Sequence, residues 1–79
     1  MSKPELLRLL EQTLRLSEQT LTGREHLQGV PNWDSMSILA FIAMVDRKFG
    51  VALRGSRVCA CQTVDDLLGL IGSAPLRAA

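Results

Sequence analysis

The sequence has few of the residues that build disulfides or metal sites. Among its 79 residues are two cysteines and one histidine. Cys59 and Cys61 are separated by one residue, a spacing at which their side chains diverge too far for an easy disulfide. His26 lies far from both in sequence, which leaves too few ligands for a zinc site. We therefore expect reduced thiols and no metal.

Long apolar runs and an excess of one charge are also missing. The most apolar stretch, residues 36–45, has about half the length of a membrane span, and the N-terminus has no apolar core of a signal peptide. Nine basic and eight acidic residues are spread along the chain and give a net charge of +1. Without a basic stripe, a nucleic-acid surface is not expected. We expect a soluble, cytoplasmic protein.

The short chain favours a carrier or binding role over catalysis. We expect one domain over residues 1–79, with an ordered core of about 3–72 and a frayed tail at 73–79, where Pro75 follows the last periodic pattern. A domain of this size buries only about 60% of its unfolded surface, which leaves little core for an enclosed catalytic cleft. The sequence offers no catalytic triad either.

A helical pattern opens the chain. Ser2 and Glu5 form a capping box, and leucines at helical spacing continue to about Ser17. The helix has one core face, and its other face alternates in charge, so we expect that second face to be solvated. The core residues are Leu6, Leu7, Leu10 and Leu14, and the charged ones are Glu5, Arg8, Glu11, Arg15 and Glu18.

Glycine and proline then interrupt the pattern from Thr20 to Asn32, which predicts a long loop. Its expected anchors to the core are Leu21, Leu27 and Val30, and His26 is expected at its surface. Long loops in compact domains are unusual unless they serve a function. This loop delivers the chain to the most apolar segment of the protein.

That segment predicts a helix from Ser35 to Phe49, with Asp34 as its N-cap and Gly50 as a left-handed C-cap. Nine of the ten residues from 36 to 45 are apolar, too many to bury in so small a core. We expect an exposed apolar stripe that serves as a docking surface, unless the preceding loop covers it. The stripe is Met36, Ala40 and Met44, and the core face is Ile38, Phe41 or Ile42, Val45 and Phe49.

Two further helical elements complete the predicted fold. Arg54 to Gln62 predicts a short irregular or single-turn segment, and Thr63 then caps a last helix with Asp66 in the capping box. The apolar face of this helix comprises Val64, Leu67, Leu68 and Ile71. The fold class is therefore all-α: a small bundle of three main helices and one short helix, with a long loop between the first and second.

Three motifs follow one another along the chain: Asp34-Ser35-Met36 before an apolar helix, Phe49-Gly50-Val51 at its end, and Thr63-Val64-Asp65-Asp66-Leu67 further on. Together they resemble the motifs of the acyl carrier proteins over nearly the whole chain. The resemblance implies that a separate phosphopantetheinyl transferase attaches a 4′-phosphopantetheine arm from coenzyme A to Ser35. It also implies that Asp34 helps the transferase to position its metal and coenzyme A. A helix N-terminus favours the phosphate of such an arm electrostatically.

A carrier of this kind is not an enzyme. The resemblance implies a stand-alone, generally monomeric protein that holds acyl intermediates as thioesters and presents them to acyl-loading, condensing or other acyl-processing enzymes. Met36, Ala40, Met44 and Trp33 are candidates for partner contacts, although Trp33 is as well suited to filling the gap where the loop meets the bundle. A pocket that shelters the acyl chain is expected to involve Phe41, Val45, Val64 and Leu68.

The chain departs from the strongly acidic carriers of fatty-acid biosynthesis, whose second helix presents glutamates to basic enzymes. The matching stretch here contains Asp46 but also Arg47 and Lys48. We therefore predict a dedicated carrier in a specialised pathway for a polyketide, nonribosomal peptide or unusual lipid, with partners that present more apolar faces. Two alternatives stay open: an aminoacyl or peptidyl carrier, which usually has glycine where this chain has Trp33, and an unmodified helical protein-interaction module.

Overall fold

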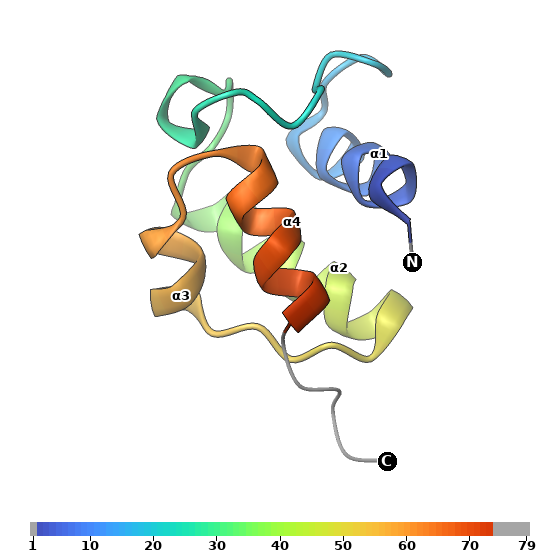
Figure 1. Ribbon diagram of the computed structural model, residues 1–79, viewed down its shortest axis with the longest axis vertical. Coiled ribbons are helices and arrows are strands. Elements are labelled where there is room, and N and C mark those ends of the chain that lie inside the picture. Colours follow the sequence, from blue (N-terminus) through green and yellow to red (C-terminus); the bar gives the residue numbers. More distant parts are fainter. Residues whose placement is uncertain (1, 74–79) are drawn as a thin grey trace.

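Four helices and one 3-10 turn make up the part of the chain that the computed structural model describes, residues 2–73 (Figure 1). The elements are α1 (Lys3–Leu14), η1 (Leu27–Gly29), α2 (Ser35–Phe49), α3 (Gly55–Ala60) and α4 (Val64–Ser73). The predicted all-α bundle with three main helices and one short helix is confirmed. The predicted frayed tail lies, apart from Ser73, outside the described residues.

The caps of α1 and α2 explain where these helices begin and end. Ser2 accepts a hydrogen bond from the Glu5 N–H in the predicted capping box, but α1 ends at Leu14 and not near Ser17. Arg15 adopts a left-handed conformation with φ 60° and turns the chain away from the helix axis. Helix α2 has the predicted bounds, and Gly50 ends it with φ 66°.

One cluster of buried apolar side chains joins all four helices and the loop. The three predicted loop anchors belong to it, whereas α2 contributes only Phe41 and Val45 as buried residues. Ile38, Ile42 and Phe49, predicted for the core face, are half-buried and pack against the cluster from its edge. The cluster comprises Leu6, Leu7, Leu9, Leu10, Leu14, Leu21, Leu27, Val30, Phe41, Val45, Val51, Val58, Val64, Leu67, Leu68 and Ile71.

The long loop between α1 and α2 is fixed across the start of α4 by backbone hydrogen bonds. The N–H of Val64 donates to the carbonyl of Glu25 at 2.9 Å, and the N–H of Asp65 donates to the carbonyl of Gly23 at 2.8 Å. These donors are among the first N–H groups of α4, which have no partner within the helix. The Thr63 hydroxyl accepts the Asp66 N–H at 3.1 Å, as the predicted capping box requires.

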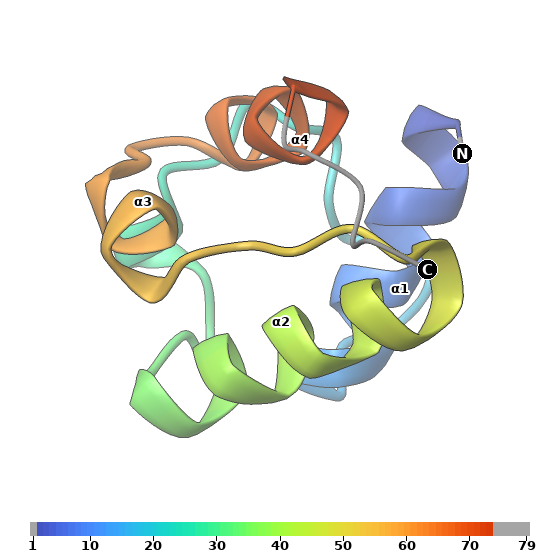
Figure 2. The ribbon, with the colours of Figure 1, turned by 90° about the horizontal axis from the view of Figure 1, so that it is seen from below.

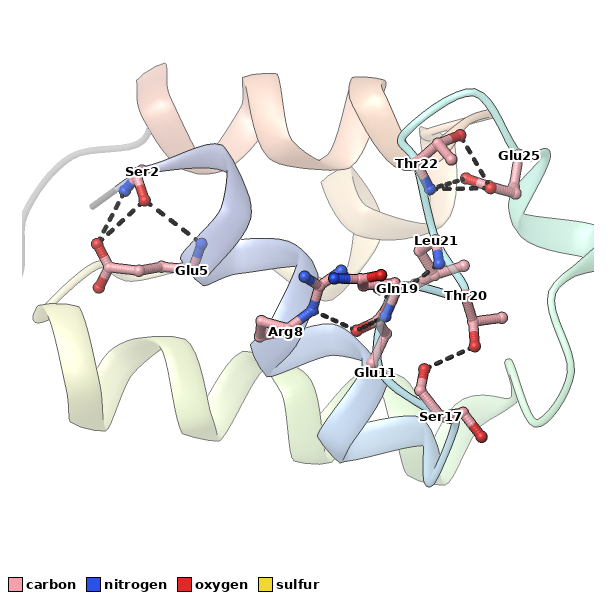
Figure 3. A network of polar contacts seen from close by, with 10 residues as sticks. All are labelled: Ser2, Glu5, Arg8, Glu11, Ser17, Gln19, Thr20, Leu21, Thr22 and Glu25. Atoms are coloured by element: carbon pink, nitrogen blue, oxygen red, sulfur yellow. Dashed lines mark hydrogen bonds and ion pairs between the residues drawn. The ribbon is translucent and has the colours of Figure 1, made fainter.

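Glu11 is buried, contrary to the prediction that it lies on a solvated face. Its side chain is 1% exposed, and it accepts hydrogen bonds from the N–H groups of Gln19, at 3.2 Å, and Leu21, at 2.8 Å, and from the Arg8 guanidinium (Figure 3). The chain turns back over α1 after Ser17, and this turn brings those two N–H groups onto the carboxylate.

These contacts keep Glu11 ionised at neutral pH. Burial alone would raise its pKa, but the hydrogen bonds from Arg8 and from the two backbone N–H groups outweigh burial and lower the pKa below the ordinary value. The carboxylate therefore holds the first residues of the loop against α1.

Candidate functional site

Ser35, the serine predicted for modification, is the first residue of α2 and is exposed. No residue between 2 and 73 forms a hydrogen bond with its hydroxyl. A serine in this position has helical backbone geometry, but its side chain is free to take part in a reaction. Its backbone lies beside the unpaired N–H groups at the start of the helix, where a negative group is stabilised.

Asp34 caps the helix immediately before Ser35. Its carboxylate accepts the Ser37 N–H at 2.9 Å and the Ser37 hydroxyl at 2.8 Å. The Ser37 N–H, the Ser37 hydroxyl and the Met36 N–H lower the pKa of Asp34, while slight burial opposes them. Asp34 is therefore ionised at neutral pH, and its orientation is set by Ser37.

Asn32 connects this site with the end of α1. Its side-chain amide donates to the carbonyl of Leu14 at 2.8 Å, and its own carbonyl accepts the Ser37 hydroxyl. Its backbone is left-handed, with φ 67°, a conformation that asparagine adopts more readily than most residues. Asn32 was not among the residues predicted for the site, although an asparagine between a proline and a helix cap indicates a turn position.

The exposed apolar face of α2 differs from the predicted stripe. Met36 and Leu39 are 81% and 66% exposed, and Ala40 and Ala43 are also exposed. Met44 is half-buried and packs against the core. In an α-helix, a residue eight positions on is rotated by about 80°, whereas one seven positions on is rotated by only about 20°. Met44 therefore turns toward the core, while Ala43 stays in line with Met36.

Trp33 precedes the site and is half-buried, with its side chain packed against the core cluster. This position fits the predicted filling of the gap between loop and bundle. The segment between α2 and α3 returns along α2, so that α3 lies at the same end of the molecule as the start of α2 (Figures 1 and 2). Trp33, the site and α3 thus belong to one end of the bundle.

The four residues predicted for an acyl pocket are deeply buried in one core. Phe41, Val45 and Val64 are 0% exposed and Leu68 is 9% exposed. Two cavities at the surface are lined by other residues than these four. One, of about 370 Å³, lies against His26, Gln28 and residues 59–62, and the other, of about 450 Å³, is lined by Glu5, Arg8, Leu9, Gln12, Lys48 and Phe49.

The first of these cavities brings the sole histidine close to both cysteines. Cys59 and Cys61 are free thiols. Burial raises the pKa of Cys61, and the charges of Asp66 and Cys59 add to this effect. Residues 2–73 contain no group of three or more histidine, cysteine or acidic side chains placed to hold a metal ion.

None of the helices between residues 2 and 73 is long and apolar enough to cross a membrane. A family model described as "phosphopantetheine attachment site" matches residues 4–71, from the first turn of α1 to the last turns of α4. Searches of curated proteins and of solved structures give no match. Domains of this family are tethers without catalytic groups, and they interact with phosphopantetheinyl transferases and acyl-processing enzymes. The chain belongs to the phosphopantetheine attachment site family, the acyl carrier protein domain that holds a covalently bound 4′-phosphopantetheine group.

Proposed function

We propose that this protein holds acyl intermediates on a 4′-phosphopantetheine arm attached to Ser35. The observation that supports Ser35 best is its exposed hydroxyl, which no residue between 2 and 73 engages, at the first position of α2 and within the matched region. The neighbouring Ser37 is less suitable, because its hydroxyl bonds to Asp34 and Asn32. Once attached, the arm supplies a thiol that forms thioesters with acyl groups.

The attachment reaction needs only a hydroxyl from this chain. The Ser35 Oγ forms a bond to the phosphorus of the pantetheine phosphate, the pyrophosphate bond of coenzyme A breaks, and adenosine 3′,5′-bisphosphate leaves. The hydroxyl proton is released, and the transferase supplies the base that accepts it. Asp34 is ionised and fixed by Ser37. We expect it to help the transferase position its metal and coenzyme A.

The phosphodiester that results is anionic. It would lie beside the N–H groups of the first turn of α2, where the helix dipole favours negative charge by about 0.3–1 kcal/mol at an exposed site. The flexible arm beyond it raises the local concentration of the acyl group at a bound enzyme to about the millimolar range.

Incubation with coenzyme A and a broad-specificity phosphopantetheinyl transferase tests the proposal by intact-protein mass. The wild-type protein and the Ser37→Ala variant should each gain one phosphopantetheinyl group, and the Ser35→Ala variant should gain none. Loading of Ser35→Ala would contradict the site. No loading of the wild-type protein, under conditions that load a control carrier, would favour the unmodified interaction module.

We propose the exposed face of α2, with Met36 and Ala40, as the surface that partner enzymes contact, together with Trp33. Met44 is half-buried and therefore contributes little area to this surface, whereas the exposed residues Leu39 and Ala43 extend it. An apolar patch beside a modification site suits partners that present an apolar rim around their active site. The apolar character of this surface supports a carrier in a specialised pathway, for a polyketide, nonribosomal peptide or unusual lipid.

An acyl chain could be sheltered between α2 and α4, against Phe41, Val45, Val64 and Leu68. These side chains fill the core, so entry of an acyl chain requires that they move apart.

The same serine and arm would serve an aminoacyl or peptidyl carrier. An acyl carrier and an aminoacyl or peptidyl carrier are distinguished by the enzyme that loads the holo-protein, an acyltransferase for the first and an adenylating enzyme for the second.

A further inference from the structure

We infer that Asn32 is a positioning residue for the modification of Ser35, an inference that rests on the function proposed above. Asn32 is three residues before Ser35 and lies outside the helix. Its side-chain amide bonds to the Leu14 carbonyl at 2.8 Å, and its carbonyl accepts the Ser37 hydroxyl. Two helices that are separated by a long loop are thereby joined at the site through one residue, by its side chain to α1 and by its backbone carbonyl to α2.

The first contact fixes Asn32 to α1. Leu14 is the last residue of α1, so its carbonyl has no partner within the helix. The N–H groups of Arg15 and Leu16 donate to Gln12 and Glu11, which leaves the Leu14 carbonyl for the Asn32 amide. The end of α1 is held in the bundle by the buried side chain of Leu14, which is 1% exposed. Asn32 is therefore anchored to a helix end that the core holds in place.

The second contact links Asn32 to the residues around Ser35. The Ser37 hydroxyl shares its one proton between the Asn32 carbonyl and the Asp34 carboxylate, and the Ser37 N–H also donates to Asp34. The orientation of Asp34 thus depends on Ser37, and that of Ser37 depends on Asn32. Ser35 has no side-chain bond to a described residue, so its position depends on this backbone and on these neighbours.

Glycine at position 32 isolates the contribution of the amide. Glycine adopts φ 67° without strain, so Asn32→Gly removes the bond to Leu14 and leaves the backbone conformation allowed. Gln19→Gly is the matched control, because Gln19 has φ 64° but bonds through its backbone to Glu11 and not to Asn32, Asp34 or Ser37. Both variants are assayed as apo-protein substrates of the transferase, below their melting temperatures.

A positioning role predicts a specific kinetic pattern. The docking surface on α2 is unchanged, so the KM for the apo-protein should stay near that of the wild type, while kcat falls by about fivefold, which corresponds to about 1 kcal/mol. Gln19→Gly should leave both constants unchanged. A loss of folded protein alone would instead raise the apparent KM and preserve kcat.

Substitution of Ser37 gives a second test, which does not depend on the stability of Asn32→Gly. Ser37→Ala should lower kcat without abolishing loading, and Ser37→Thr, which retains a hydroxyl, should restore it. An unchanged kcat in Asn32→Gly, or in Ser37→Ala, would overturn the inference while leaving the proposed function intact. Failure of the wild-type protein to load would contradict the proposed function, and this inference with it.

Discussion

At the scale of single residues, the most consequential feature is that polar side chains hold the loop and the site in place. Glu11 fixes the start of the loop, and Asn32 fixes its end. Both connect α1 with chain that is distant in sequence. Ser35, by contrast, has no such bond among the described residues, which suits the proposed attachment of the arm to its hydroxyl.

Replacement of Glu11 should destabilise the fold and change its response to acid. Glu11→Gln removes a charge that accepts two backbone N–H groups in a buried site, so the free energy of unfolding should fall by about 1–3 kcal/mol at neutral pH. Glu18→Gln, at an exposed position, is the control and should change stability by less than about 0.5 kcal/mol. Urea denaturation measures both.

The sign of the pH effect follows from the lowered pKa of Glu11. The unfolded state binds the proton more tightly, so the stabilisation is present above the ordinary pKa of 4.5 and is lost as the pH falls through the lower folded-state value. The difference in stability between wild type and Glu11→Gln should therefore shrink below about pH 4. A difference that grows in acid would contradict this account.

At the scale of helices and loops, the sequence predicted what local chemistry determines. Asp34 and Gly50 gave both ends of α2 correctly, because an N-cap side chain and a left-handed glycine act through their own neighbours. The predicted end of α1, the predicted exposure of Glu11 and the predicted exposure of Met44, which is half-buried, were wrong. Each of these depends on tertiary packing: the left-handed turn at Arg15, the loop folded over α1, and the exact rotation of α2 on the core.

The contact between loop and α4 gives a second test at this scale. Gly23 has φ 111°, a backbone conformation that strains any residue with a side chain, and a Cβ there would also displace the Asp65 side chain. Gly23→Ala should therefore lower the free energy of unfolding by about 1–3 kcal/mol. Gly29→Ala, where no atom lies within 4 Å, is the control. Equal melting temperatures for the two variants would show that the loop does not need a glycine at position 23.

The exposed face of α2 predicts a separation of folding from docking. Leu39 is 66% exposed, so Leu39→Asp should leave the melting temperature nearly unchanged and still slow the transfer of an acyl group by the enzyme that uses this carrier. Gln12→Asp on the exposed side of α1 is a suitable control. Equal effects of the two substitutions on transfer would exclude α2 as the contact surface.

At the scale of the whole molecule, a net charge near zero conceals an uneven distribution. Residues 35–61 contain four basic residues and one acidic residue, a net charge of +3, although the whole chain has only +1. The basic residues are exposed and come from α2 and the segment around α3: Arg47, Lys48, Arg54 and Arg57. The end and surroundings of the proposed docking helix are therefore positive.

This distribution should exclude enzymes that bind acidic carriers through basic patches, since like charges at an interface are repulsive. The double variant Arg47→Glu with Lys48→Glu should be processed faster than the wild type by such an enzyme at low salt, and the gain should shrink as salt is added. Reversal of two exposed cations in the segment between α1 and α2, Arg15→Glu with Arg24→Glu, is the control. Faster processing of the control pair to the same extent would assign the effect to net charge alone.

The central claim is that one hydroxyl, that of Ser35, receives the arm, and fragment mass spectrometry of the loaded protein tests it most directly. Trypsin should release residues 25–47 as one peptide that contains both Ser35 and Ser37. Fragment ions from electron-transfer dissociation separate the two serines at Met36. The account predicts that the added mass appears in every fragment that contains Ser35 and in none that contains Ser37 alone. Added mass on Ser37, or a peptide that stays unmodified in a fully incubated sample, would contradict it.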